Sequence, residues 1–131
     1  MKIVDVVGAV IWNEHNEVLC ALRSQAMSLP GLWEFPGGKI EIGETPQESL
    51  IREIQEELDC VIKVTEFVAE VTYEYPTVIV RLITYNATII NGIPTPKEHE
   101  KLLWLPIKQL TTLEWAPADL PTIDEVMKLS N

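Results

Sequence analysis

Three glutamates at helical spacing are the residues of this sequence best placed to do chemistry. Glu53, Glu56 and Glu57 stand at positions i, i+3 and i+4 of one segment, so a helix would carry their carboxylates on one face. Left unpaired, such acids repel one another by about 0.2–0.5 kcal/mol a pair. A run of this kind is most often a solvated acidic face, and the triplet alone does not separate that interpretation from a cation site.

A glycine pair ahead of the acids favours the cation site. Gly37 and Gly38 allow close approach of the backbone and conformations closed to other residues. Carbonyls of such a turn, beside carboxylates, are the hard oxygen ligands that Mg²⁺ prefers. Because Mg²⁺ takes its remaining ligands from water and substrate phosphates, the combination indicates phosphoryl chemistry on a phosphate-rich ligand.

The same stretch resembles the Nudix family. The positions that match the Nudix box are Gly38, Glu44, Arg52, Glu53, Ile54, Glu56 and Glu57, and the run from Trp33 to Glu57 is similar to the MutT-type branch. Two positions depart from the box, since Asp59 replaces its second glycine and Cys60 its last aliphatic residue. Asp59 falls just past the expected helix end, where a left-handed residue is common. We therefore expect Asp59 to lower stability rather than catalysis.

The resemblance implies an enzyme that uses Mg²⁺, with Mn²⁺ as a substitute. The implied metal ligands are the Gly37 carbonyl, Glu53, Glu56, Glu57 and Glu98. Glu100 is the alternative to Glu98. His99 between them could line the site, although an ordinary role is the favoured interpretation. Arg52 is expected to orient the glutamates through charge-assisted hydrogen bonds, while Glu44 has a structural role. Either Glu53 or Glu98 accepts the proton of the attacking water.

Five further residues are expected to bind the nucleotide. Arg23 and Lys39 adjoin the glycine-rich loop and are candidates for phosphate contact. Phe35 and Tyr75 match positions that pack the nucleobase in the MutT-type branch, although core packing explains them equally well. Asp119 could read an exocyclic amine of the base, because an ionised carboxylate accepts hydrogen bonds. Its plainer role is the N-cap of the last helix.

These roles imply hydrolysis of a nucleoside triphosphate to the monophosphate and pyrophosphate. The resemblance allows two substrates, 8-oxo-dGTP as in nucleotide-pool sanitising or (d)CTP, and residues 116–121 look more like the (d)CTP relatives. An ADP-ribose or dinucleotide hydrolase of the same fold is an alternative. A non-catalytic Nudix-like nucleotide-binding module is another, but such modules tend to lose the box glutamates that this chain keeps.

The elements that must position these residues read as a mixed α+β pattern. Strands are predicted over 3–12, 18–22, 62–75, 78–90 and 102–105, a loop over 24–44, and helices over 45–58, 107–110 and 120–129. Together with the resemblance, this order predicts an α/β/α sandwich in which helices flank a central mixed β-sheet. The whole chain, residues 1–131, is expected to form a single Nudix hydrolase domain.

The helix that carries the glutamates has the clearest local signals. Thr45 and Glu48 form a capping box, and Pro46 suits the first helical position. The apolar stripe opposite the acids is expected to consist of Leu50, Ile51, Ile54 and Leu58. Arg52 is expected to pair with Glu48 and Glu56, four residues away on either side.

Charge and composition limit the partners. The net charge of −10 argues against a nucleic-acid polymer, while a small nucleotide remains compatible if cations neutralise the acids. No apolar run reaches the roughly 18–20 residues of a membrane span, and no signal peptide is evident. Cys20 and Cys60 are expected to be buried thiols, so we expect a cytoplasmic protein, monomeric or weakly homodimeric.

Overall fold

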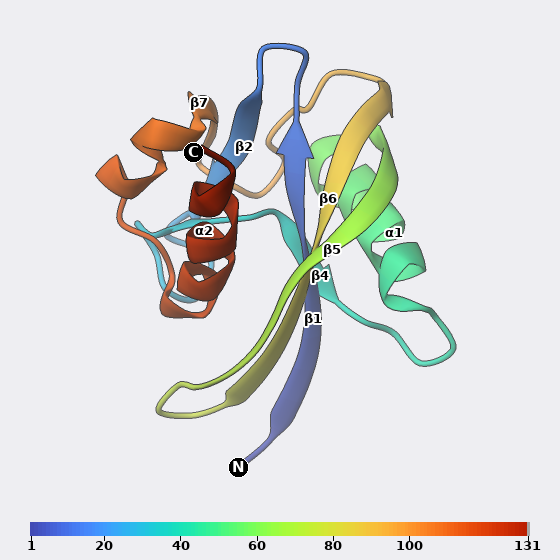
Figure 1. Ribbon diagram of the computed structural model, residues 1–131. Coiled ribbons are helices and arrows are strands. Elements are labelled where there is room, and N and C mark those ends of the chain that lie inside the picture. Colours follow the sequence, from blue (N-terminus) through green and yellow to red (C-terminus); the bar gives the residue numbers. More distant parts are fainter. Residues whose placement is uncertain (131) are drawn as a thin grey trace.

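A seven-stranded mixed sheet lies at the centre of the computed structural model, which describes residues 1–130 (Figure 1). Its strands are β1 (Ile3–Trp12), β2 (Glu17–Leu22), β3 (Trp33–Glu34), β4 (Gly37–Lys39), β5 (Val61–Glu74), β6 (Ile79–Asn91) and β7 (Lys101–Pro106). The order is β3-β2-β1-β6-β5, with β4 paired to β1 and β7 to β2. The central strand β1 runs parallel to β6 and antiparallel to β2 and β4. The predicted mixed sheet is therefore confirmed.

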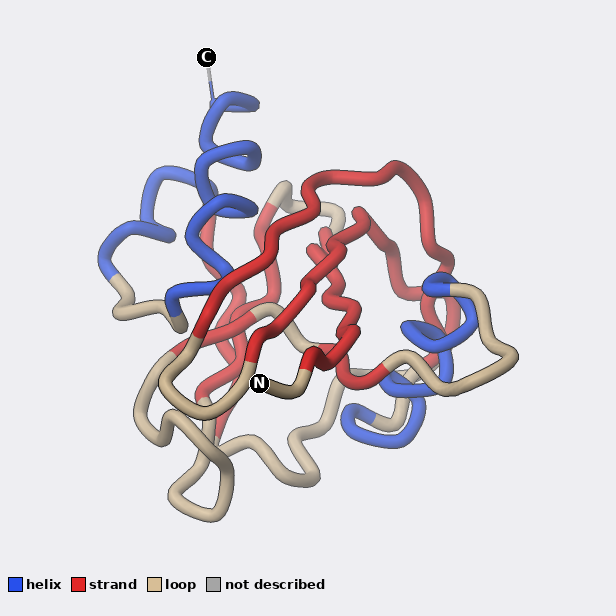
Figure 2. Tube along the Cα trace, turned by 90° about the horizontal axis from the view of Figure 1, so that it is seen from below, coloured by secondary structure: helices blue, strands red, loops and turns tan. Residues whose placement is uncertain are grey.

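Helices cover both faces of this sheet. Helix α1 (Pro46–Leu58) packs on one face, and α2 (Leu120–Met127) lies on the other (Figure 1; Figure 2). Short 3₁₀ segments η1 (Ile107–Thr112), η2 (Pro117–Asp119) and η3 (Lys128–Ser130) accompany α2. This arrangement confirms the expected α/β/α layering. The expected domain extends to Asn131, which lies outside the described residues.

Each face of the sheet has its own apolar core because successive strand residues point to opposite faces. On β1, Val7, Ala9 and Ile11 join the core beneath α1, whereas Val10 joins the core beneath α2. A fully buried Val, Leu or Ile contributes about 1.5–3 kcal/mol. The α1 core fixes the helix against β1, and β1 in turn carries β4.

Helix α1 begins and ends as its sequence predicts. Thr45 Oγ1 accepts the Glu48 N–H at 3.1 Å, and Glu48 Oε1 accepts the Thr45 N–H at 2.8 Å, which completes the capping box. Pro46 occupies the first helical position. At the other end, Asp59 is left-handed with φ 56° and ψ 40°, and its N–H bonds the Gln55 carbonyl.

Some details of the sequence-based prediction are wrong. Ile51 is 39% exposed and lies outside the buried stripe of α1, while Ser49 is fully buried beside Leu50. Residues 24–44 are not all loop, because they contain β3 and β4. The last helix is α2 followed by the 3₁₀ segment η3, and the helix predicted over 107–110 is the 3₁₀ segment η1.

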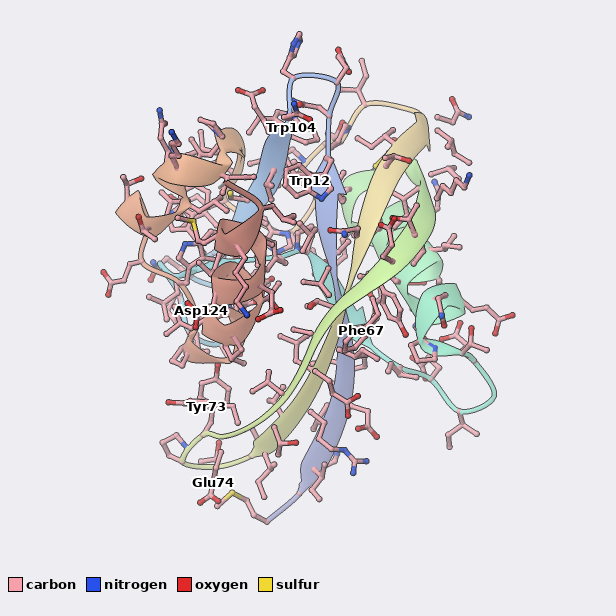
Figure 3. All side chains as sticks on the ribbon, viewed as in Figure 1. Trp12, Phe67, Tyr73, Glu74, Trp104 and Asp124 are labelled. Atoms are coloured by element: carbon pink, nitrogen blue, oxygen red, sulfur yellow. The ribbon has the colours of Figure 1, made fainter. Side chains whose placement is uncertain are left out.

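The β5–β6 hairpin turns at residues 75–78, as predicted, where the Tyr75 N–H bonds the Val78 carbonyl at 2.8 Å. Figure 3 shows Tyr73 and Glu74 at this tip and Trp12 toward the opposite end of the sheet. Cys20 and Cys60 are buried free thiols, as expected. Within residues 1–130, no helix combines the length and the apolar character needed to cross a membrane.

Candidate active site

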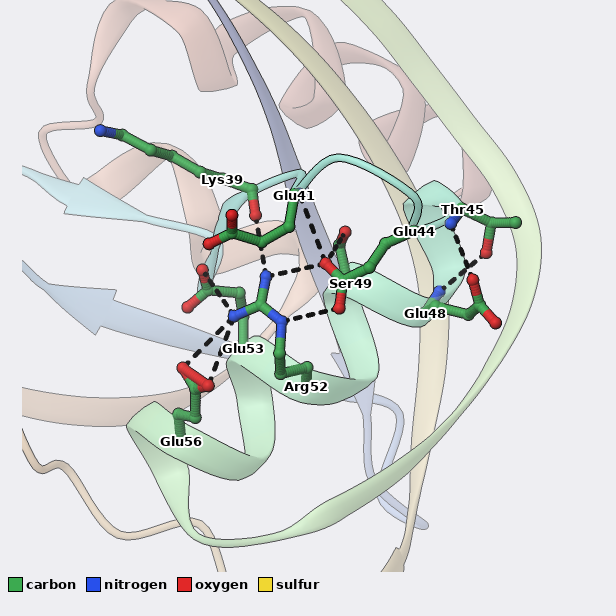
Figure 4. Close-up of polar contacts among 9 residues, drawn as sticks. All are labelled: Lys39, Glu41, Glu44, Thr45, Glu48, Ser49, Arg52, Glu53 and Glu56. Atoms are coloured by element: carbon green, nitrogen blue, oxygen red, sulfur yellow. Dashed lines mark hydrogen bonds and ion pairs between the residues drawn. The ribbon is translucent and has the colours of Figure 1, made fainter.

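Arg52 is the hub of the polar contacts on α1 (Figure 4). Its guanidinium makes a bidentate pair with Glu44 at 2.9 and 3.0 Å, and it donates to the Lys39 carbonyl at 3.1 Å. A third nitrogen lies 3.3 Å from Glu56 and 3.4 Å from Glu53. The expected pairing with the acid at i−4 is wrong, because that side chain belongs to the capping box. Arg52 instead joins the glycine-rich loop to the acidic face.

Glu44 holds Arg52 in place rather than facing the open site. The Arg52 hydrogen bond, helped by the Ser49 hydroxyl 2.7 Å away, lowers the pKa of Glu44 to about 2. Glu44 in turn raises the pKa of Arg52. This bidentate ion pair is the geometry in which Arg–carboxylate contacts are strongest. The hydrogen bond to Glu44 satisfies the Ser49 hydroxyl, which allows Ser49 to be buried in the helix.

The three glutamates differ in their surroundings. Glu56 is 57% exposed and turns to Arg52. Burial raises the pKa of Glu53, against the opposing effects of Arg52 and the Lys39 backbone. Burial also raises the pKa of Glu57, to about 7, and the negative charges of Glu53, Glu34 and Glu98 add to this, while His99 opposes it. Two partly buried carboxylates thus lack enough positive charge nearby.

The glycine pair fits closely around Glu53. A Cβ on Gly38 would lie 2.3 Å from the Glu53 carboxylate, and a Cβ on Gly37 would lie 1.9 Å from the Val7 carbonyl of β1. Gly37 therefore requires glycine, whereas a side chain at Gly38 would displace the Glu53 carboxylate. Gly37 and Gly38 of β4 pair with Gly8 and Val7 of β1. This pairing fixes Gly38, against which the Glu53 carboxylate packs.

These residues fit a divalent cation, although they are not gathered as ligands. Within residues 1–130, no three His, Cys, Asp or Glu side chains converge closely enough to hold a metal ion, and Glu56 is turned to Arg52. Burial, followed by the charges of neighbouring acids, raises the pKa of Glu53 and Glu57, and a bound cation would favour their ionised forms. The oxygen-only donor set suits a hard ion such as Mg²⁺.

The segment from Thr95 to Glu100 bridges the helix and the sheet. Thr95 and Lys97 donate backbone hydrogen bonds to the carbonyls of the last two residues of α1, at 2.8 and 3.2 Å, and Glu100 donates to the end of β2 at 2.9 Å. Glu98 is exposed, and its charge reaches Glu57. Glu100, its alternative, is also exposed. The segment therefore lies against the C-terminal end of α1, and the ligand role of Glu98 stays a prediction.

A second polar cluster lies between β2, β3 and η2. Arg23 donates to Glu34 at 2.6 Å, and the His99 ring lies 2.7 Å from the other oxygen of Glu34. Arg23 also bonds the backbone carbonyl and the hydroxyl of Ser28. All the guanidinium nitrogens of Arg23 thus have partners. Binding of a phosphate by Arg23 would have to displace one of them.

Asp119 is buried at the edge of this cluster. Burial holds the pKa of Asp119 well above its ordinary range, the negative charge of Glu34 adds to this, and the Phe35 backbone N–H and Arg23 oppose it. Asp119 occupies the N-cap position of α2, but its side chain makes no cap hydrogen bond. The capping role weighed from the sequence is therefore wrong for this side chain.

The two aromatic candidates behave differently. Phe35 is buried, with its ring 4.9 Å from Trp115 in the core beneath α2, so the core-packing interpretation describes it. The Tyr75 hydroxyl accepts the Ala118 N–H at 3.0 Å, which ties the β5–β6 hairpin to the segment before Asp119. Tyr75 is only partly buried.

The structure separates some predicted residues and adds others. The Lys39 side chain extends into solvent away from Arg52 (Figure 4) and has no carboxylate partner within residues 1–130. Glu34 is central to the second cluster, but its place in the sequence predicted no role for it. β3 spans only Trp33–Glu34, and an acid next to a buried strand residue points to the opposite face and normally meets solvent, so no local signal marks this residue.

Comparisons with known proteins agree with this geometry. A model of the NUDIX domain matches residues 2–126. The chain is 34% identical over 129 residues to the CTP pyrophosphohydrolase of Escherichia coli (strain K12), across 98% of this chain and 95% of the relative. It is 31% identical over 129 residues to the 8-oxo-dGTP diphosphatase of the same strain, across 98% of this chain and 100% of the relative.

A solved structure shows a similar fold over nearly the whole chain. The solution structure of the DNA mismatch repair protein MutT, of the Nudix hydrolase family, from methicillin-resistant Staphylococcus aureus 252 superimposes with a TM-score of 0.80. The sequences are 48% identical, and the match covers 98% of this chain and 99% of the other. The layered sheet and its helices are thus shared with a MutT protein.

Proposed function

The chain belongs to the Nudix family and is a Nudix hydrolase, and we propose that it cleaves a nucleoside triphosphate to the monophosphate and pyrophosphate. The observation that carries the proposal is that burial raises the pKa of the neighbouring carboxyls of Glu53 and Glu57, with the Glu53 carboxylate packed against Gly38. Nudix hydrolases generally need a divalent metal ion. Acids in such a setting suit a cation that also binds phosphate oxygens.

We infer that the cation is Mg²⁺, with Mn²⁺ as a substitute. Glu53, Glu56, Glu57, Glu98 and the Gly37 carbonyl would hold it, as hard oxygen donors. When bound, Mg²⁺ supplies Lewis acidity that makes water more nucleophilic at neutral pH and neutralises phosphate charge. For Glu56 to take part, it has to leave Arg52, 3.3 Å away across a weak, exposed contact.

The remaining residues of α1 orient the acids and move protons. Arg52, held by Glu44, keeps Glu53 beside the glycine turn through a charge-assisted contact of 3.4 Å. Glu53 and Glu98 are the two candidates that accept a proton from the attacking water. Glu53 is partly buried, with a raised pKa, which suits a proton acceptor better than a fully solvated acid.

The base is read by Asp119 in this proposal. With its raised pKa, the Asp119 carboxyl keeps a proton to higher pH than an exposed acid, so it can donate as well as accept. Arg23 lies beside this cluster, and Lys39 is free to approach the phosphates. Tyr75 holds the segment that carries Asp119. Base stacking by Phe35 finds no support, because Trp115 already covers its ring.

The substrate in this proposal is 8-oxo-dGTP or (d)CTP, and the similar E. coli proteins are named for 8-oxo-dGTP and for CTP. We also propose that residues 1–131 form one catalytic domain that acts in the cytoplasm as a monomer or weak homodimer. The free, buried thiols of Cys20 and Cys60 suit a reducing compartment.

Product analysis tests the reaction. The purified protein with Mg²⁺ is given 8-oxo-dGTP, dGTP, dCTP, 5-methyl-dCTP, CTP and ADP-ribose, and kcat/KM is measured for each. The expected products are a nucleoside monophosphate and pyrophosphate, with one triphosphate preferred. Release of inorganic phosphate, or cleavage of ADP-ribose alone, would contradict the proposal. No product from any compound would favour a binding module.

A further inference from the structure

The His99 ring is fixed deep in the protein between the two clusters. Its side chain is fully buried, and the residues around it are tied to α1 and to β2. Lys97 donates to the Glu57 carbonyl at 3.2 Å and Glu100 donates to the Leu22 carbonyl at 2.9 Å. Because these backbone bonds flank the residue, the position of the ring is set by the chain and not only by its own contacts.

The ring has one polar contact among the described residues. Nε2 lies 2.7 Å from Glu34 Oε2, whereas the buried Nδ1 has no hydrogen-bond partner. Arg23 donates to the other Glu34 oxygen at 2.6 Å, so Glu34 serves as an acceptor for Arg23, and we assign the hydrogen between Glu34 and His99 to Nε2. A buried nitrogen without a partner destabilises the fold. An apolar side chain at position 99 would have no unpartnered nitrogen. What the imidazole adds is its hydrogen bond to Glu34.

Glu34 lies where its position affects the Asp119 carboxyl. The Asp119 carboxyl accepts the backbone N–H of Phe35, the residue after Glu34, and the Glu34 charge acts on it. Arg23 and His99 hold Glu34 from two sides. A carboxylate offers about four lone-pair sites, so Glu34 can accept another hydrogen bond while it keeps both partners. Glu34 and Asp119 thus present an acceptor beside a protonatable acid.

We propose that His99 is a positioning residue that fixes Glu34, opposite Arg23, as part of the polar surface that discriminates between nucleobases. The proposal rests on the nucleoside triphosphate hydrolysis proposed above. His99 acts through Glu34 and does not touch the substrate. Loss of its Nε2–H lets the Glu34 carboxylate move relative to Asp119, which changes the hydrogen-bond pattern offered to the base.

Two polar variants separate this role from packing. Glutamine presents an N–H near the position of Nε2, and asparagine presents one near Nδ1, so H99Q keeps the donor to Glu34 and H99N loses it. For each variant and the wild type, kcat/KM is measured for dCTP, CTP, dGTP and 8-oxo-dGTP with Mg²⁺. The readout is the ratio between the preferred nucleotide and the others, because a packing defect lowers all four rates alike.

We expect H99N to lower that ratio by about tenfold, the size of a lost hydrogen bond to a charged group, and H99Q to restore most of it. Equal ratios in H99N and the wild type would overturn the role of His99 while the proposed function stands. A wild type that hydrolyses none of the four overturns both.

A measurement on the wild type tests the geometry independently of activity and of variant folding. Long-range ¹H–¹⁵N spectra distinguish the two ring nitrogens of a histidine by their protonation. We expect a proton on Nε2 of His99, and loss of its hydrogen-bonded resonance in E34Q. A His99 ring protonated on Nδ1 alone would exclude donation to Glu34 and would overturn the proposal.

Discussion

At the scale of single residues, Glu57 carries the clearest electrostatic signature of the site. Burial raises its pKa to about 7 from an ordinary value of 4.5, and the charges of Glu53, Glu34 and Glu98 add to that effect. A carboxyl in this condition destabilises the fold when it ionises, unless a cation is bound. Glu57 thus links proton binding, metal binding and stability.

This linkage predicts a pH dependence of the metal-free protein. Because the folded pKa of Glu57 is raised, its contribution to stability is fully present below about pH 4.5 and is lost as the pH rises through about 7. With a chelator present, we expect the free energy of unfolding of the wild type, relative to E57Q, to fall by on the order of 1 kcal/mol between pH 4.5 and 8, because Glu57 is only partly buried and solvent screens the effect. Urea unfolding at several pH values measures this.

Mg²⁺ provides the matching control. Since the ion favours the ionised carboxylate, it should stabilise the wild type more at pH 8 than at pH 5, and should stabilise E57Q less at both. If the free energy of unfolding changed with pH in the same way for the wild type and E57Q, with and without Mg²⁺, Glu57 would be an ordinary surface acid.

The sequence indicated the residues of the acidic face but not those of the second cluster. Glu53, Glu56 and Glu57 follow from helical spacing, which is a local property. The contact of Glu34 with His99 joins residues 65 positions apart, and the pairing of β2 with β3 and β7 creates it. Spacing along the chain carries no information about such a contact.

At the scale of elements, α1 shows how local sequence sets the site. The capping box and Pro46 fix where the helix starts, and Asp59 ends it in a left-handed conformation. Both features are short-range and were predictable. The burial of Ser49 in place of Ile51 was not, because it depends on Glu44 accepting the Ser49 hydroxyl.

The left-handed residue at the end of α1 gives a stability prediction. A side chain at φ 56° costs free energy that glycine avoids, so D59G should raise the free energy of unfolding by about 0.5–1 kcal/mol and the Tm by about 2–4 °C. Turnover should be unchanged because Asp59 does not face the acids. D59A is the matched control, and we expect it to be no more stable than the wild type.

Thermal unfolding and kcat, measured for the wild type, D59G and D59A, test this prediction. A lower Tm for D59G, or a several-fold loss of its activity, would mean that Asp59 has a role beyond ending the helix.

The strands β3 and β4, unlike α1, could not be predicted from the local sequence. They are 2 and 3 residues long, too short for a periodic signal, and exist because β2 and β1 offer them hydrogen-bonding edges.

At the scale of the whole molecule, the sheet brings the two clusters together. Strand β1 supports β4 and its glycines, while β2 and β3 carry Arg23 and Glu34 toward the segment that holds Glu98 and His99. The net charge of −10 adds to the local excess of acids. Cations bound at the acidic face would compensate for both, and they would allow a polyanionic substrate to approach.

The most direct test of this account is Mg²⁺-dependent pyrophosphate release by the wild type and by E57Q, each with its preferred nucleoside triphosphate. We expect release by the wild type that stops with a chelator and returns with Mg²⁺. E57Q, folded by circular dichroism, should be about 100-fold slower or worse, because several kcal/mol of charge stabilisation are lost. Equal rates for the two proteins, or release that persists without any divalent cation, would contradict an active site built on the acidic face of α1.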